Sequence, residues 1–109
     1  MKNHLKKTFW TVYILRNEKN ALYTGITTNL ERRLNEHKNK LLKGAKFTRS
    51  CKTLGLVYHC GIGKHGPALT VEAKIKRLKK NKKEIIVATG LKKTELYEYL
   101  SLPYKENNL

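Results

Sequence analysis

Residues 12–37 read VYILRNEKNALYTGITTNLERRLNEH, and this stretch decides the fold. Two runs rich in aromatic and β-branched residues, 9–15 (FWTVYIL) and 22–26 (LYTGI), are typical of β-strands. Between them, residues 17–20 form a polar break with turn-prone ends. The sequence therefore predicts a β-hairpin near the start of the folded part of the chain.

The register of this hairpin decides where two tyrosines fall. Tyr13 and Tyr23 are ten residues apart. If the strands pair around Glu18, the two tyrosines become near-opposite neighbours on one face of the sheet. A register shifted by one residue would separate them, because successive residues of a strand point to opposite faces.

A helix is predicted directly after the hairpin. Thr28 or Asn29 can cap its first turn, where Glu31 suits the helix dipole. Gly44 is expected to end the helix. Helical spacing places the following residues on or beside one apolar stripe: Leu30, Arg33, Leu34, His37 and Leu41.

The second half of the chain predicts one more strand and further helices. Residues 54–60 (LGLVYHC) are typical of a strand, and residues 61–67 (GIGKHGP) of a glycine-rich connection. We expect a helix from about residue 68 to 80, with Pro67 at its start. A second helical stretch over residues 82–88 is expected to stop at Gly90, and TELYEYL in the tail indicates a weak amphipathic helix.

Glu72 stands out within the helix predicted over residues 68–80. Its spacing places it on the same line as the apolar residues Leu69, Ile75 and Leu78. A lone carboxylate on an inward line costs free energy unless it is paired or bound to a metal. Glu72 is therefore a candidate for a functional role.

The order strand, strand, helix, strand, helix, helix predicts an α+β fold with a small three-stranded antiparallel sheet flanked by helices. A chain of 109 residues fits one domain. We expect a basic arm at residues 1–7, a folded domain over 8–90 and a helical tail over 91–109.

The charge balance indicates the partner. The chain has 24 Lys and Arg against 8 Asp and Glu, a formal net charge of +16. So large an excess attracts polyanions, and nucleic acid, DNA before RNA, is the expected partner. Nothing resembles a dedicated basic amphipathic anchor, so no membrane partner is expected.

The expected compartment is the cytoplasm. The N-terminal apolar run is interrupted by Thr8 and Thr11 and lacks a small-residue cleavage site, unlike a signal peptide. Cys51 and Cys60 are too few for a disulfide framework. We therefore expect reduced thiols.

Five ordered positions indicate a family. The sequence carries TVY at residues 11–13 and YTG at 23–25, followed by ERRLNEH and LTVEAKIKRL, which contain Arg33, His37 and Glu72. In this order and context the chain resembles the GIY-YIG nuclease superfamily, and within it the small stand-alone bacterial domain proteins. The resemblance covers about residues 8–88, and the ordered set is far more specific than either tripeptide.

The resemblance implies metal-assisted hydrolysis of a nucleic-acid phosphodiester. It assigns Glu72 as the single protein ligand of Mg²⁺ or Mn²⁺, and Tyr13 as the group that takes a proton from the attacking water. Arg33 would stabilise the phenolate and the charge that grows on the phosphate. Tyr23 would hold a phosphate oxygen or the water, and His37 would relay a proton or contact a phosphate. Gly25 is expected to keep the strand surface clear for close backbone approach.

The chain departs from the family pattern at two motif positions. Thr11 replaces the glycine of the first motif and Thr24 the central isoleucine of the second. Neither touches the implied chemistry. The family often has an asparagine after the glutamate helix, and Asn81 is not assigned that role.

Two other motifs are weak. Residues 61–66 match G-x-G-x-x-G, but a dinucleotide site needs a parallel βαβ unit and an acidic residue on a strand, which Glu84 does not provide. Zinc-type ligands also occur, but adjacent strand residues point to opposite faces, so a shared site is awkward. These ligands are Cys51, His59, Cys60 and His65.

The remaining basic residues are expected to contact the nucleic-acid backbone without reading bases. Those predicted to do so are Arg32, Lys43, Lys46, Arg49, Lys76, Lys79 and Lys80. The leading hypothesis is a divalent-metal-dependent endonuclease, on DNA before RNA, with little sequence specificity. The alternatives are a non-catalytic DNA- or RNA-binding module and a nucleoid- or ribosome-associated protein with the same fold.

Overall fold

The structure is a computed structural model that describes residues 8–43 and 53–104, with backbone alone for 40–43. Strands β1 (Trp10–Asn17), β2 (Leu22–Thr27) and β3 (Leu54–Gly63) form an antiparallel sheet in the order β2-β1-β3. The helices in the described residues are α2 (Leu30–Lys43), α3 (His65–Arg77), α4 (Lys80–Thr89) and α5 (Lys93–Tyr99). The predicted α+β fold with a three-stranded antiparallel sheet is confirmed.

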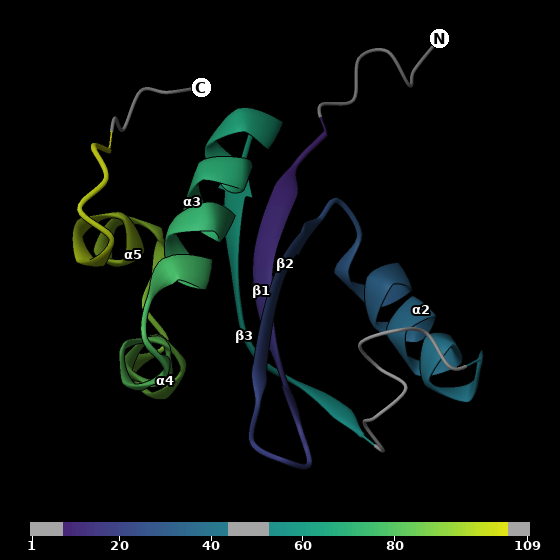
Figure 1. Cartoon of the computed structure of the whole chain (residues 1–109). Helices are drawn as coiled ribbons and strands as arrows, with labels where there is room; N and C mark the ends of the chain where they lie inside the picture. The colour runs from purple at the N-terminus through teal and green to yellow at the C-terminus, as the bar shows by residue number, and fades with distance from the viewer. Residues whose placement is uncertain (1–7, 44–52, 105–109) are drawn as a thin grey trace, which may run out of the picture.

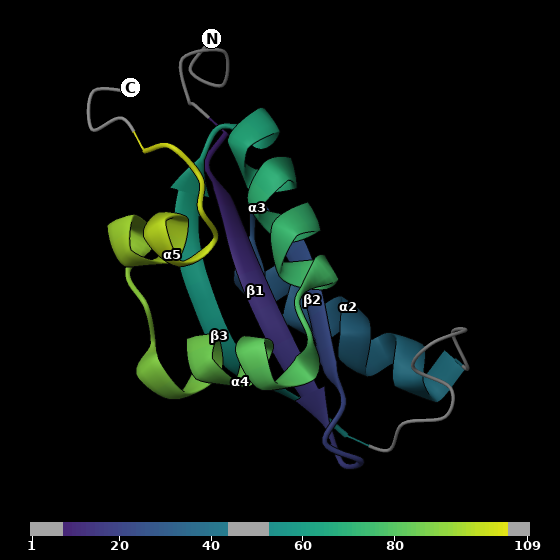
Figure 2. The same cartoon turned by 60° about the vertical axis from the view of Figure 1, so that its left-hand side comes forward.

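The sheet separates the helices into two layers. Helix α2 lies on one face, and α3, α4 and α5 lie on the other (Figure 1), as the rotated view also shows (Figure 2). The hydrophobic core fills the second layer, where alternate residues of the sheet meet the three helices. Its fully buried side chains include Val12, Ile14, Val71, Ile75, Ile86 and Leu96.

The hairpin forms as predicted, but its register differs. Tyr13 pairs with Gly25, and Leu15 pairs with Tyr23, so the strands pair around Lys19 and not Glu18. The two tyrosines are therefore diagonal neighbours. Because the partner strand is displaced by two residues, both tyrosines still point to the same face.

The turn explains this register. The side-chain oxygen of Asn17 accepts hydrogen bonds from the backbone N–H groups of Lys19 and Ala21, both at 2.9 Å. Asn20 adopts the left-handed region with φ 69°, which asparagine tolerates better than most residues. These contacts extend β1 to Asn17 and set the length of the loop.

Asn29, one of the two predicted caps, caps the first turn of α2. Its Oδ1 accepts a hydrogen bond from the backbone N–H of Arg32 at 2.9 Å. The helix is described as far as Lys43, and Gly44, its predicted end, lies outside the described residues.

Three boundaries in the second half differ from the prediction. Residues 61–63 continue β3, where the sequence suggested a connecting loop, because their backbone still pairs with β1. Helix α3 therefore begins at His65, and Pro67 lies in its first turn, where its missing N–H costs nothing. Helix α4 also begins earlier than predicted, while Gly90 ends it in a left-handed conformation with φ 63°.

The inward face of α3 also differs from the prediction. Leu69 is 44% exposed, and the buried line consists of Ala68, Val71 and Ile75. Glu72 follows Ala68 by four residues and precedes Ile75 by three, so it lies at the border of this line.

Helix α5 packs into the same core as the sheet. Its residues Leu96 and Tyr97, together with the following Leu100, belong to the buried cluster. The residues that the sequence suggested as a tail thus contribute buried apolar surface as far as the described chain extends.

Candidate active site

Tyr13 lies over the backbone of β2. Its side chain is only 4% exposed, and a Cβ placed on Gly25 would come within 2.5 Å of the phenolic oxygen. Only glycine at this position of β2 leaves room for the Tyr13 ring. Gly25 was predicted to keep the strand surface clear for close backbone approach, whereas in the structure the ring of Tyr13 occupies this space.

Helix α2 delivers two polar groups to the Tyr13 hydroxyl. Arg33 Nε donates a hydrogen bond to it at 3.2 Å, and His37 Nε2 lies 3.3 Å from the same oxygen. His37 is 3% exposed. The hydrogen bond to Tyr13 raises the pKa of Arg33, with a further contribution from Glu36, whose carboxylate lies 3.1 Å from Nη1. The guanidinium is therefore charged beside the phenol.

Helix α3 delivers a carboxylate from the other layer. The Glu72 side chain is 17% exposed, and its Oε2 lies 3.1 Å from Nζ of Lys76 one helical turn later. Glu72 thus lies at the border of the core, with an ammonium group at its carboxylate.

These groups line a single cavity of about 550 Å³. Residues 22–26 of β2 all contribute to its wall. Since alternate strand residues point to opposite faces, the cavity runs over the free edge of β2 and connects the two helical layers. Tyr13, Arg33 and His37 line it from the α2 side, and Glu72 and Lys76 from the α3 side.

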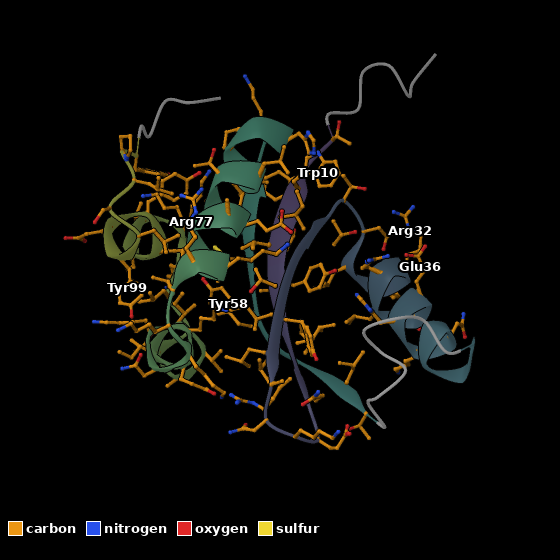
Figure 3. The ribbon with its side chains drawn as sticks, in the orientation of Figure 1. Trp10, Arg32, Glu36, Tyr58, Arg77 and Tyr99 are labelled. Atoms are coloured by element: carbon orange, nitrogen blue, oxygen red, sulfur yellow. The ribbon has the colours of Figure 1, made fainter. Side chains whose placement is uncertain are left out.

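The structure brings together all five predicted catalytic residues, because Tyr23 also lines the cavity. The predicted nucleic-acid contacts are more scattered. Lys76 lines the cavity, whereas Arg32, Lys79 and Lys80 do not and are exposed. Arg32 projects from α2 beside Glu36 (Figure 3), with Nε 3.7 Å from the Glu36 carboxylate. Three predicted contacts lie outside the described side chains: Lys43, Lys46 and Arg49.

Lys83 lines the cavity and was missed as a site residue. The prediction placed Lys83 at the start of a helix beginning at residue 82 and gave its side chain no direction. The helix in fact begins at Lys80, so Lys83 lies within its first turn. Lys83 precedes the fully buried Ile86 by three residues, so it shares the inward side of the helix. That spacing is the sequence signal that could have found it.

The donor set fits a hard divalent cation held by few protein ligands. Glu72 presents one carboxylate to a cavity with space for water and for phosphate oxygens. Mg²⁺ is commonly bound by one or two carboxylates, with waters and substrate phosphates completing its shell. Across residues 8–43 and 53–104, no three His, Cys, Asp or Glu side chains gather as a metal cage.

The described residues of the two weak motifs do not line the cavity. His59 is exposed and Cys60 is buried, so the adjacent pair does face opposite ways. Cys51 lies outside the described residues. Glu84 lies on α4 and accepts two hydrogen bonds of 2.7 Å from Arg16, which makes it a structural contact between α4 and β1.

A phenol from β1, a guanidinium and an imidazole from α2 and a carboxylate from α3 thus line one cavity at the edge of an antiparallel sheet. Residues 9–84 match the GIY-YIG catalytic domain. The chain belongs to this family, whose members are typically endonucleases that act on nucleic acid and generally use divalent metals.

Similar proteins share most of their length with this chain. The UPF0213 protein PC1_0597 of Pectobacterium carotovorum is 48% identical over 80% of this chain and 86% of its own. The UPF0213 protein YhbQ of Escherichia coli K12 is 42% identical over 88% and 94%. The solution structure of the UPF0213 protein BH0048 from Bacillus halodurans is 33% identical, covers 87% of this chain and 99% of its own, and has a TM-score of 0.50.

A helix crosses a bilayer only if about 20 consecutive residues are predominantly apolar. None of the helices in residues 8–43 and 53–104 combines the length and the apolar character needed to cross a membrane.

Proposed function

We propose that this protein is a divalent-metal-dependent endonuclease that hydrolyses phosphodiester bonds of nucleic acid, DNA before RNA, with little sequence specificity. The observation that carries the proposal is the shared cavity, in which the Tyr13–Arg33–His37 cluster and the Glu72 carboxylate meet at the edge of β2. Glu72 is paired with Lys76, so its partial burial alone does not require a metal, and it is the position of this carboxylate in the same cavity as the Tyr13 cluster that favours a catalytic role over phosphate binding alone.

Tyr13 is the proposed general base. A tyrosine acts as a base only as its phenolate, and its reference pKa is near 10. Arg33 Nε donates a hydrogen bond to the phenolic oxygen at 3.2 Å, which places its positive charge beside the proposed base. His37 Nε2, at 3.3 Å, accepts the phenolic proton when that nitrogen is unprotonated. The phenolate then takes the proton of the attacking water.

Arg33 has a second proposed role at the phosphate. Its guanidinium is charged and lines the cavity, so it also stabilises the negative charge that grows on the phosphate oxygens. Tyr23 lines the same wall and would orient a phosphate oxygen or the water. A divalent ion bound at Glu72 would supply Lewis-acid stabilisation of the same charge.

Flanking phosphates would contact basic side chains around the cavity. Lys76 and Lys83 line it directly and are the strongest candidates. Arg32 and Lys80 each have a carboxylate partner, at 3.7 Å and 2.6 Å, so each contributes less to phosphate binding. Such contacts hold the backbone and carry no sequence information, which agrees with the low specificity proposed.

The test is cleavage with matched variants. Purified protein is incubated with supercoiled plasmid, branched DNA and structured RNA, in Mg²⁺, Mn²⁺ or EDTA, beside Glu72→Ala and Tyr13→Phe. We expect cleavage by the wild type in metal and almost none in EDTA or by either variant. Equal cleavage by wild type and variants would mean contamination. Binding by all proteins without cleavage of any substrate would favour the non-catalytic module.

A further inference from the structure

We propose that Lys76 competes with the divalent ion for the Glu72 carboxylate, and that a nucleic-acid phosphate relieves this competition by binding Lys76. The inference rests on the proposed function and adds a coupling between substrate and metal at the same site. It makes Lys76 a positioning residue and not only a phosphate contact.

The competition follows from geometry. Lys76 Nζ lies 3.1 Å from Glu72 Oε2. A magnesium ion requires oxygen ligands at about 2.0–2.1 Å, so it would place two further positive charges close to this ammonium. In a partly enclosed cavity such like charges repel strongly. The carboxylate therefore favours one cation at a time.

Lys76 is able to leave. Its side chain is 56% exposed, whereas that of Glu72 is 17% exposed. The lysine has a long flexible stem, and the carboxylate is held at the border of the core. Movement of the ammonium into the cavity is thus the low-cost response when a second cation approaches Glu72.

A phosphate in the cavity offers Lys76 an alternative partner. Arg33, Lys76 and Lys83 all line this space, so a bound phosphate would meet cations from three helices. Once Lys76 contacts the phosphate, the Glu72 carboxylate is open to the divalent ion. Reciprocity then requires that the metal also strengthen substrate binding.

The coupling has a chemical consequence. A free protein with a weakened metal site binds the ion mainly together with its substrate, so the metal-loaded cavity forms around a phosphate. If the Lys76–Glu72 pair served only to stabilise the helix, it would contribute a little stability and would not link metal binding to phosphate binding. A helix-stabilising Lys76 and a competing Lys76 therefore predict different metal affinities for the protein, although the fold is the same.

The first measurement is Mn²⁺ binding to the full chain without nucleic acid, by electron paramagnetic resonance of the free ion. Removing the competitor with Lys76→Gln should tighten Glu72-dependent binding by about fivefold or more, a typical coupling. Lys74→Gln removes the same charge from the same helix, outside the cavity lining. It should change binding by less than about twofold, since salt screens charges that are not in contact.

The second measurement adds a short DNA duplex in a Tyr13→Phe background, chosen to limit cleavage. DNA should tighten Mn²⁺ binding when Lys76 is present and have a much smaller effect with Lys76→Gln. Equal, Glu72-dependent Mn²⁺ binding with and without Lys76 would overturn the inference and leave the proposed function intact. Mn²⁺ binding unaffected by Glu72→Ala in every protein would overturn the proposed metal site and the inference together.

Discussion

Glu72 of α3 and Glu84 of α4 each form an ion pair with a lysine four residues away, yet their surroundings differ. Glu84 receives two 2.7 Å hydrogen bonds from Arg16 and one of 2.6 Å from Lys80. These contacts hold its pKa at about 2. Glu72 has Lys76 at 3.1 Å and lines the cavity that also contains Tyr13. The fold fixes Glu84 between two elements and leaves Glu72 beside a space for a ligand.

The largest expected effect is on the cleavage rate, when each of the two carboxylates is changed to an amide. Glu72→Gln should lower the cleavage rate by about 10³-fold, because losing the charge proposed to hold the metal would remove several kcal/mol of transition-state stabilisation. Glu84→Gln should leave the rate unchanged. Initial rates on one DNA substrate at saturating Mg²⁺ measure both. Equal rates for the two variants would remove the distinction between a chemical and a structural carboxylate.

The next effect tests whether the position of Tyr13 matters while Glu72 stays intact. A methyl group at Gly25 would lie 2.5 Å from the phenolic oxygen, so Gly25→Ala must displace the ring. A displacement of this kind can cost about 10²-fold in rate.

Cleavage rate and thermal midpoint measure the effect of Gly25→Ala together. Because the clashing atoms are the end of a side chain, the rate should fall much more than the midpoint. Gly66→Ala is the control, since a Cβ there meets nothing within 4 Å. Full activity in Gly25→Ala would show that the seat of Tyr13 on β2 is not needed for the reaction.

A smaller effect reverses the comparison and concerns stability. Glu84→Gln should lower the thermal midpoint by about 2–5 °C, since the contact between α4 and β1 loses its charge. Glu72→Gln should change it less, because Lys76 is mostly exposed. Scanning calorimetry of the two variants beside the wild type decides the order, and a larger loss for Glu72→Gln would contradict it.

The fold class and the order of strands and helices could be predicted from the sequence because they depend on local pattern, although β3 continues three residues beyond its predicted end. The five residues predicted as catalytic were taken from the ordered motifs, and the structure places all of them around one cavity. Alternation places Tyr13 and Tyr23 on one face under either register, so an error of two residues in pairing did no harm. The Asn29 cap and the Gly90 stop were also readable, since both rest on the conformational preferences of single residues.

The remaining features depend on specific contacts, some within a turn and some between distant segments, that residue patterns do not specify. The register follows from the hydrogen bonds of Asn17 within the turn, and nothing in the spacing of apolar residues specifies it. The spacing of Lys83 from Ile86 suggests the inward side of α4, but that Lys83 lines the cavity beside β2 follows only from the way α4 packs on the sheet. The ring of Tyr13 over Gly25 is likewise visible only when the two strands are paired.

The smallest expected effect is the loss, at low pH, of the stability that the Glu84 carboxylate contributes. Since the folded pKa of Glu84 is about 2 and its reference value is 4.5, its ionised form stabilises the fold. That stabilisation is fully present above pH 4.5 and is lost as the pH falls through about 2. The difference in urea midpoint between wild type and Glu84→Gln should therefore be constant from pH 7 to 5 and shrink below pH 4.5. Urea unfolding at each pH measures it, and the subtraction cancels the other carboxylates. A difference that grew on acidification would mean that Glu84 is held in its protonated form, with the opposite sign of linkage.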